Sequence, residues 1–222
     1  MSPPPTFTVC FHGIGTPDHE REPGEAGYWV GRDQFHTLLD WVVQVPRVSI
    51  SFDDGNRSDV DVALPALAER GVAATFFPVV DRLGDPWSVS TAGLHELVGA
   101  GMDVGTHGLT HKPWAGLRGA EARAEILSPR HALEDLLGRP VDRAAAPLGR
   151  YDRRTLALLR SDGCAEVNVS DQRPARPGAW VQPRFSVRAD DSVASLRARM
   201  LTSMAPVRRV RNGVASAAKR WR

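Results

Sequence analysis

The chain has 222 residues, of which 28 are basic and 26 acidic, so its formal net charge is +2 at neutral pH. This length suffices for one domain with a sizeable core, and the hydrophobic share of 42% and the charged share of 24% are ordinary for a globular protein. No apolar run approaches the roughly 20 residues that span a bilayer. The first residues lack the basic and apolar parts of a signal peptide, so we expect a cytoplasmic protein.

The hydrophobic pattern alternates strands and helices along the chain. In chain order it predicts a strand at 6–12, a loop at 13–27, a helix at 33–43, a strand at 48–52, a helix at 59–70, a strand at 73–79, a helix at 91–101, a strand at 102–107, a helix at 120–137, a strand at 144–146, a helix at 152–161, strands at 166–170 and 182–187, and a helix at 192–200. Thr91 is expected to cap its helix, and Pro129 to divide the helix at 120–137.

Repeated β-α units of this kind imply a mainly parallel sheet with helices outside it. With about seven units the sheet either closes as a barrel or stays open. Functional residues in such folds lie at the C-terminal ends of the strands. The predicted strand ends carry His12, Asp53, Asp54, His107 and the loop at 147–149.

Basic side chains gather at the end of the chain. Residues 201–222 hold six of them and no acidic residue, which leaves 22 basic and 26 acidic side chains in residues 1–200. We therefore divide the chain into a domain at 1–200 and a basic tail at 201–222. Such a tail can touch an anionic membrane surface weakly, and we expect no specific binding of nucleic acid. Cys10 and Cys164 are expected to be free thiols.

Two adjacent aspartates end the predicted strand at 48–52. Neighbouring residues on a strand point to opposite sides, so Asp53 and Asp54 can take different tasks, one binding a metal and the other acting as a base. About fifty residues later, His107 and His111 are four residues apart. On one helical turn or in a tight loop, that spacing lets both imidazoles reach the same ion.

These motifs, in this order and spacing, resemble those of the polysaccharide deacetylases, a NodB-like family also known as carbohydrate esterase family 4. The first family motif, Thr-Phe-Asp-Asp-Gly, corresponds to residues 51–55, and the second, His-Ser/Thr-x-x-His, to residues 107–111 with Gly108 in place of the hydroxyl residue. The third motif, Arg-x-Pro-x-Gly or Ala-Tyr-Pro-Tyr-Gly, corresponds to Ala-Ala-Pro-Leu-Gly at 145–149. The resemblance covers roughly residues 6–200.

The resemblance implies a distorted (β/α)7 barrel that removes the acetyl group from the nitrogen of an N-acetylhexosamine-containing glycan or glycoconjugate and releases acetate. It implies Asp54, His107 and His111 as ligands of one divalent metal ion and Asp53 as general base. Zinc is the default metal for this ligand set, which would also accept cobalt, nickel or iron. The partner is then a carbohydrate substrate, and the oligomeric state is not readable.

The chain departs from the family pattern at two places. No histidine follows His131, so the family's late histidine is missing. The first and last strands of a barrel are neighbours, so His12 can take its place as general acid, as in the branch that de-N-acetylates poly-N-acetylglucosamine. The third-motif arginine is Ala145 here. Arg184 could supply the positive charge that orients Asp53, and Arg150 is a weaker candidate.

Further residues are predicted to shape a substrate cleft. Pro147, Leu148 and Tyr151 lie on the third-motif loop and could touch the acetyl group or the sugar. Trp114 and Trp180 offer aromatic faces on which sugar rings could stack, and ordinary packing explains both equally well.

Other functions fit the pattern less well. A zinc protease needs a glutamate where Gly108 stands, and two-histidine, one-carboxylate iron oxygenases have all-β scaffolds rather than alternating β and α elements. A carbohydrate O-acetyl esterase and an inactive, carbohydrate-binding relative remain as alternatives.

Overall fold

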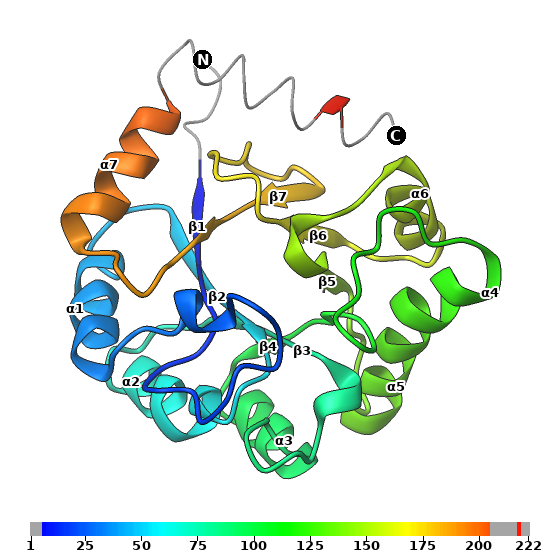
Figure 1. The fold of residues 1–222 in the computed structure, drawn as a ribbon, viewed down its shortest axis with the longest axis horizontal. Helices are drawn as coiled ribbons and strands as arrows, with labels where there is room; N and C mark the ends of the chain where they lie inside the picture. Colours follow the sequence, from blue (N-terminus) through cyan, green and yellow to red (C-terminus); the bar gives the residue numbers. More distant parts are fainter. Residues whose placement is uncertain (1–5, 205–216, 219–222) are drawn as a thin grey trace.

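A ring of parallel strands with helices outside it forms the protein (Figure 1). The computed structural model describes residues 6–204 and 217–218. Every pairing between the named strands is parallel. The strands are β1 (Phe7–Phe11), β2 (Val48–Asp54), β3 (Thr75–Pro78), β4 (Asp103–Val104), β5 (Arg143–Ala145), β6 (Glu166–Val169), β7 (Val181–Pro183) and β8 (Phe185–Ser186).

The strands fall into two sheets that together close a distorted barrel. One sheet has the order β4-β3-β2-β1-β8 and the other the order β5-β6-β7. A parallel bridge between Thr106 and Ala144 joins the sheets on one side. On the other side the chain passes from β7 to β8 through Arg184, which breaks the single strand predicted at 182–187. β7 and β8 together take the seventh position, which confirms the predicted distorted (β/α)7 barrel.

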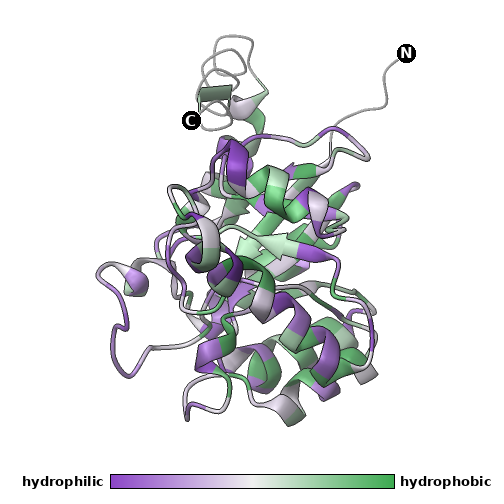
Figure 2. Ribbon diagram, turned by 90° about the vertical axis from the view of Figure 1, so that its right-hand side faces the viewer, coloured by the Kyte–Doolittle hydropathy of each residue, from purple (hydrophilic) through white to green (hydrophobic). Residues whose placement is uncertain are grey.

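Seven α-helices of the described chain cover the barrel. They are α1 (Arg32–Val42), α2 (Leu64–Glu69), α3 (Thr91–Gly99), α4 (Gly119–Ala122), α5 (Ser128–Leu137), α6 (Arg153–Ser161) and α7 (Val193–Ser203). Short 3-10 turns lie at Glu25–Tyr28, Val80–Arg82 and Pro147–Gly149. Figure 2 shows apolar residues along the strands and hydrophilic residues on the loops and outer helix surfaces, as burial of one helix face requires.

The local structure differs from the predictions at two helices. Ser90, not Thr91, caps α3, because its hydroxyl accepts a hydrogen bond from the Gly93 N–H at 3.0 Å. Pro129 does not break the helix at 120–137, since a π turn at Arg123–Leu127 precedes it and places the proline in the first turn of α5. A proline has no N–H to donate, so the carbonyl of Glu125 is free to bind elsewhere.

Stacked aromatic rings fill the core beneath the site. Phe52 lies 5.5 Å from Phe11 and 4.6 Å from Phe76 between ring centroids, and both pairs are stacked. These residues come from three adjacent strands, so their packing fixes the register of β1, β2 and β3. Cys10 and Cys164 are free and buried.

The described residues do not test the predicted basic tail. α7 continues to Ser203, past the boundary expected at residue 200. The six basic residues of the predicted tail lie outside the described residues. Within the described chain, no helix combines the length and apolar character needed to cross a membrane.

Candidate metal centre and active site

β2 delivers the two aspartates to the C-terminal end of the barrel. Asp53 and Asp54 end this strand and are 2% and 4% exposed. Asp54 has a φ of 76° and Gly55 a φ of 67°, so the chain turns sharply after the strand. A Cβ on Gly55 would lie 2.8 Å from the Cβ of Pro78, which explains why glycine follows the aspartates.

Asp54, His107 and His111 converge on one point. Their ligand atoms all lie within 4.8 Å of one another. Nε2 of His107 is 3.6 Å and Nε2 of His111 is 3.4 Å from Oδ1 of Asp54. That oxygen is buried and has no hydrogen-bond partner. A buried carboxylate oxygen without a donor, facing two imidazole nitrogens, fits a bound divalent cation.

The other nitrogen of each imidazole is held by an acceptor. Nδ1 of His107 lies 2.8 Å from the carbonyl oxygen of Ala145, and Nδ1 of His111 lies 2.6 Å from Oε1 of Glu22. Such contacts place the proton on Nδ1 and direct Nε2 toward a metal. Burial lowers the pKa of His107 to about 4, against the opposing effect of Asp53, so this imidazole is neutral and able to ligate at neutral pH.

Glu125 holds the histidine loop in shape. Its carboxylate accepts hydrogen bonds from the N–H and the hydroxyl of Thr110, both at 2.9 Å. The Glu125 carbonyl, freed by Pro129, accepts the N–H of Leu109 at 3.1 Å. Gly108 has a φ of 85°, and a Cβ there would lie 3.2 Å from this carbonyl. The positive φ and the close carbonyl both favour glycine at this position over the hydroxyl residue of the family motif.

Arg184 binds the carboxylate of Asp53, whose Oδ2 lies 3.8 Å from Nε2 of His107. The guanidinium donates two hydrogen bonds of 2.6 Å to the two oxygens of Asp53 and one of 3.1 Å to Ser51. Arg184 is fully buried. Burial alone would raise the pKa of Asp53, but the charge of Arg184 and its hydrogen bonds outweigh this effect and lower that pKa far below its usual range. Asp53 is thus ionised at neutral pH.

His12 lies across the cleft from the metal centre. It follows β1 and lines the same cleft as Asp53, Asp54 and the two histidines. Its ring lies 4.9 Å from that of Tyr28, and its Nδ1 is buried without a hydrogen-bond partner. One of its ring nitrogens lies within 4.8 Å of a carboxylate oxygen of Asp53.

The residues expected to contact substrate divide into two groups. Leu148 is 55% exposed and lines the cleft, and Pro147 beside it is buried at the start of the same turn. Trp114 is fully buried, so it has no open face for a sugar. Tyr151 is 2% exposed and donates its hydroxyl to Asp171.

Trp180 is directed elsewhere too. It donates its N–H to the Cys164 carbonyl at 2.7 Å and packs under Arg160, in a separate depression beside α6. The predictions for Trp114, Tyr151 and Trp180 are wrong, because all three side chains help to pack the second core cluster, around α6 and β6.

Sequence reasoning missed residues that complete the site. Glu22, Tyr28 and Arg82 line the cleft, and Arg82 donates a 2.6 Å hydrogen bond to the Glu22 oxygen that faces His111. They lie in connections that have no fixed spacing to the motifs. Glu125 is recognisable from the sequence, because it is an acidic residue among the apolar positions of a helix.

The fold and the site together define a class: an α/β barrel with one carboxylate and two imidazoles around a cation site, and a second carboxylate beside it. Residues 43–167 match the sequence profile described as polysaccharide deacetylase. The chain belongs to this family.

Individual relatives agree with this assignment. A chitooligosaccharide deacetylase of Bradyrhizobium sp. (strain ANU 289) is 26% identical over 68% of this chain and 66% of its own length. The YxkH protein of Bacillus subtilis (strain 168) is 24% identical over 52% of this chain. The chain spans only 42% and 66% of the lengths of these two relatives.

A solved structure shows the same fold. The Streptococcus pyogenes deacetylase PplD, in complex with acetate, matches with a TM-score of 0.75 and 18% identity over 90% of this chain and 99% of that one.

We expect Glu22→Gln to weaken metal binding by about 10- to 100-fold, because the charge that polarises His111 is removed while the side-chain shape stays. Competition with a chelating dye on the purified protein measures this affinity. Glu20→Gln is the matched control, since Glu20 lies in the same loop and accepts only the Ala26 N–H in the described contacts. Equal metal affinities for the two variants would contradict the role given to Glu22.

Asp59→Asn should stabilise the metal-free protein increasingly as the pH rises. Burial raises the pKa of Asp59 well above its usual range, the charges of Asp54 and Asp53 add to this, and neither carboxylate oxygen has a hydrogen-bond partner. A raised folded-state pKa means that stability falls as pH rises above the unfolded value near 4, by up to about 1.4 kcal/mol per pH unit. The asparagine variant escapes this loss.

Denaturant unfolding at pH 5 and pH 7 with a chelator present measures the difference. Asp135→Asn, at an exposed position of α5, is the control and should show no such trend. A stability gain for Asp59→Asn that does not change with pH would contradict the assignment of a protonated carboxyl.

Proposed function

We propose that this protein is a metal-dependent deacetylase that removes the acetyl group from nitrogen on an N-acetylhexosamine-containing glycan and releases acetate. One observation carries the proposal. Two adjacent aspartates are separated in role by their contacts, because Asp54 faces two imidazoles and Asp53 faces a buried arginine. Metal-dependent amide hydrolysis uses both a cation site and a free base beside it.

Asp54, His107 and His111 would hold the cation. A divalent ion bound there supplies Lewis-acid activation of a water and of the acetyl carbonyl. The neutral imidazole of His107 and the ionised Asp54 match the protonation states that a ligand needs. Zinc is the metal we propose, on the basis of the nitrogen and oxygen donors, with cobalt, nickel or iron as outcomes of metal analysis.

Asp53 is assigned as general base. Its carboxylate lies 3.8 Å from Nε2 of His107, beside the cation site rather than in it. Arg184 keeps the carboxylate ionised and holds both oxygens in a fixed plane. Asp53 would accept the proton of the attacking water.

His12 is assigned as general acid. It follows β1, which pairs with β8, the last strand of the barrel. His12 therefore enters the cleft on the side where the late histidine of the family pattern would be expected. The protonated imidazole would donate to the departing amine nitrogen when the carbon–nitrogen bond breaks. This position suggests the branch of the family that acts on poly-N-acetylglucosamine.

Amide rather than ester hydrolysis is favoured by the relative of Bradyrhizobium, whose name states deacetylation of a chitooligosaccharide. The same site could cleave an O-acetyl ester, so this reaction is the second candidate.

The test is acetate release from a panel of N-acetylated and O-acetylated sugars, with metal content determined on the same sample. We expect release from N-acetylglucosamine oligomers that is lost with a chelator and restored by zinc. Release from O-acetylated sugars alone would favour the esterase. Binding of oligomers without any release would favour an inactive relative.

A further inference from the structure

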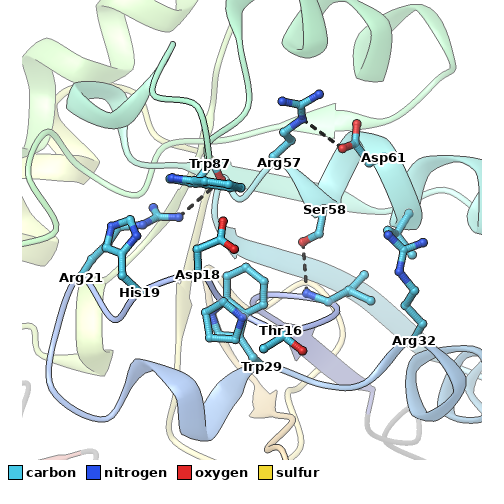
Figure 3. A pocket seen from close by; sticks show the side chains of 13 residues that line it. Thr16, Asp18, His19, Arg21, Trp29, Arg32, Arg57, Ser58, Asp61 and Trp87 are labelled. Atoms are coloured by element: carbon cyan, nitrogen blue, oxygen red, sulfur yellow. Dashed lines mark hydrogen bonds and ion pairs between the residues drawn. The ribbon is translucent and has the colours of Figure 1, made fainter.

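A second pocket lies beside the cleft and has no role in the reaction described so far. It is bordered by the first part of the loop after β1, by the turn after β2, and by Trp87 in the connection that follows β3. All three segments leave the C-terminal ends of their strands, the end at which the active site lies. Figure 3 shows Asp18 and Trp29 below Trp87, Arg57 beside it at the top, and Arg32 at the right.

The pocket is built on a rigid frame. The guanidinium of Arg21 donates to Asn56 Oδ1 at 2.5 Å and to Ser88 Oγ at 3.4 Å, and its side chain is only 14% exposed. The buried hydroxyl of Ser58 accepts the N–H of Ile14 at 3.1 Å. These contacts tie the loop after β1 to the turn after β2, so little order has to be gained when a ligand binds.

Trp87 is held by its backbone while its indole stays open. Its carbonyl accepts the N–H of Arg57 at 2.9 Å, and the next residue, Ser88, forms a bridge with Asn56. The side chain is nevertheless 48% exposed. Among the described residues, the other exposed large hydrophobic side chains are aliphatic or methionine, so Trp87 is the most open of the large aromatic side chains. An exposed aromatic face contributes little to the stability of the fold and is suited to stacking against a ligand.

Trp29 forms a second aromatic border. Its ring packs against the backbone of Gly13, where a Cβ would lie 2.1 Å from the ring. The indole Nε1 is buried and has no hydrogen-bond partner. Glycine at position 13 therefore fixes the ring in place and leaves one donor unused.

The charges of the pocket are mixed. Three arginines (Arg21, Arg32 and Arg57) and two aspartates (Asp18 and Asp61) line it, and Arg57 is paired with Asp61 at 3.0 Å. A sugar ring has hydroxyl groups that both donate and accept hydrogen bonds and an apolar face that stacks on an indole, so it matches arginines, carboxylates and tryptophans together.

We propose that this pocket binds an uncharged pyranose unit of the glycan, one or more residues away from the unit that is deacetylated. This inference rests on the proposed function and extends it to the choice of substrate length. The two pockets are adjacent along the chain: His12 and Glu22 line the cleft, whereas Ile14 and Arg21 line the second pocket. The loop after β1 therefore borders both pockets, and a glycan chain that crosses this loop would occupy both.

The test compares Trp87→Ala with the unchanged protein on N-acetylglucosamine oligomers of one to six units. We expect KM for the longer oligomers to rise about tenfold, the loss of one stacking contact, with kcat unchanged and with no effect on the shortest substrate that reacts. Arg32→Gln, at an exposed position of the same pocket, should act in the same direction. Leu201→Ala removes an equally exposed hydrophobic side chain on α7 and serves as the control.

Calorimetric titration of the same oligomers into Asp53→Asn protein separates this inference from the proposed function. Suppose that the protein with an intact Asp53 releases no acetate, but the longer oligomers bind to Asp53→Asn protein and lose about tenfold in affinity when Trp87→Ala is added. The pocket assignment then stands and the proposed activity fails. If acetate is released and Trp87→Ala leaves KM unchanged at every length, the pocket assignment is overturned. If calorimetric titration showed that the pocket binds inorganic phosphate but none of the oligomers, this result would overturn the assignment as well.

Discussion

Asp53→Asn should reduce kcat for acetate release by about 10²- to 10⁴-fold, which is the usual contribution of a positioned general base. The asparagine keeps the shape of the side chain and can still accept a hydrogen bond from Arg184, but it cannot take a proton. Since Asp53 lies beside the cation site and not among its three converging ligand atoms, the variant should retain its metal. Single-turnover acetate release and metal analysis on one sample measure both effects.

Asp54→Asn provides the comparison within the same motif. It should lose metal and activity together, because Asp54 supplies the only carboxylate oxygen of the three-residue cluster. Loss of metal in Asp53→Asn, or a kcat within a fewfold of the unchanged protein, would contradict the division of tasks between the two aspartates.

Arg184→Met should destabilise the protein by about 3–5 kcal/mol, because it leaves the buried carboxylate of Asp53 without its paired charge. Methionine fills much of the same volume, so the loss comes mainly from the charge and less from a cavity. Arg150→Met is the matched control. Arg150 was the weaker candidate for this role, and its side chain is exposed. Urea unfolding in the presence of a chelator measures both variants.

The effect of Arg184→Met should depend on pH. The folded-state pKa of Asp53 is lowered below its unfolded value, so the ion pair contributes its full stability above about pH 4, and this contribution falls as the pH drops toward the folded-state pKa. The stability gap between the two proteins should therefore be widest near pH 7 and narrow in acid. A gap that is constant from pH 7 to pH 3 would mean that packing, not charge, is the cause.

The same variant tests catalysis. Without Arg184, burial would raise the pKa of Asp53, so the acidic limb of the pH–rate profile should move to higher pH in any protein that still folds. Arg150→Met should leave that limb in place.

The sequence alone determined the features that depend on residues close to one another along the chain. Alternating apolar strands and helices predicted the parallel α/β architecture, since periodicity reports which face of each element is buried. Asp53, Asp54, His107 and His111 were recognisable because each group lies within a few residues along the chain. Their placement at strand ends followed from the topology alone.

Only the tertiary structure decided the contacts between distant segments. Arg184 meets Asp53 across 131 residues of sequence, and Glu22 meets His111 across 89. Neither pairing has a spacing that local chemistry constrains, because barrel closure brings these segments together. The sequence also could not decide the fate of an aromatic residue, as the buried Trp114 and the exposed Trp87 demonstrate. Whether a ring packs in the core or faces solvent depends on what the rest of the chain places over it.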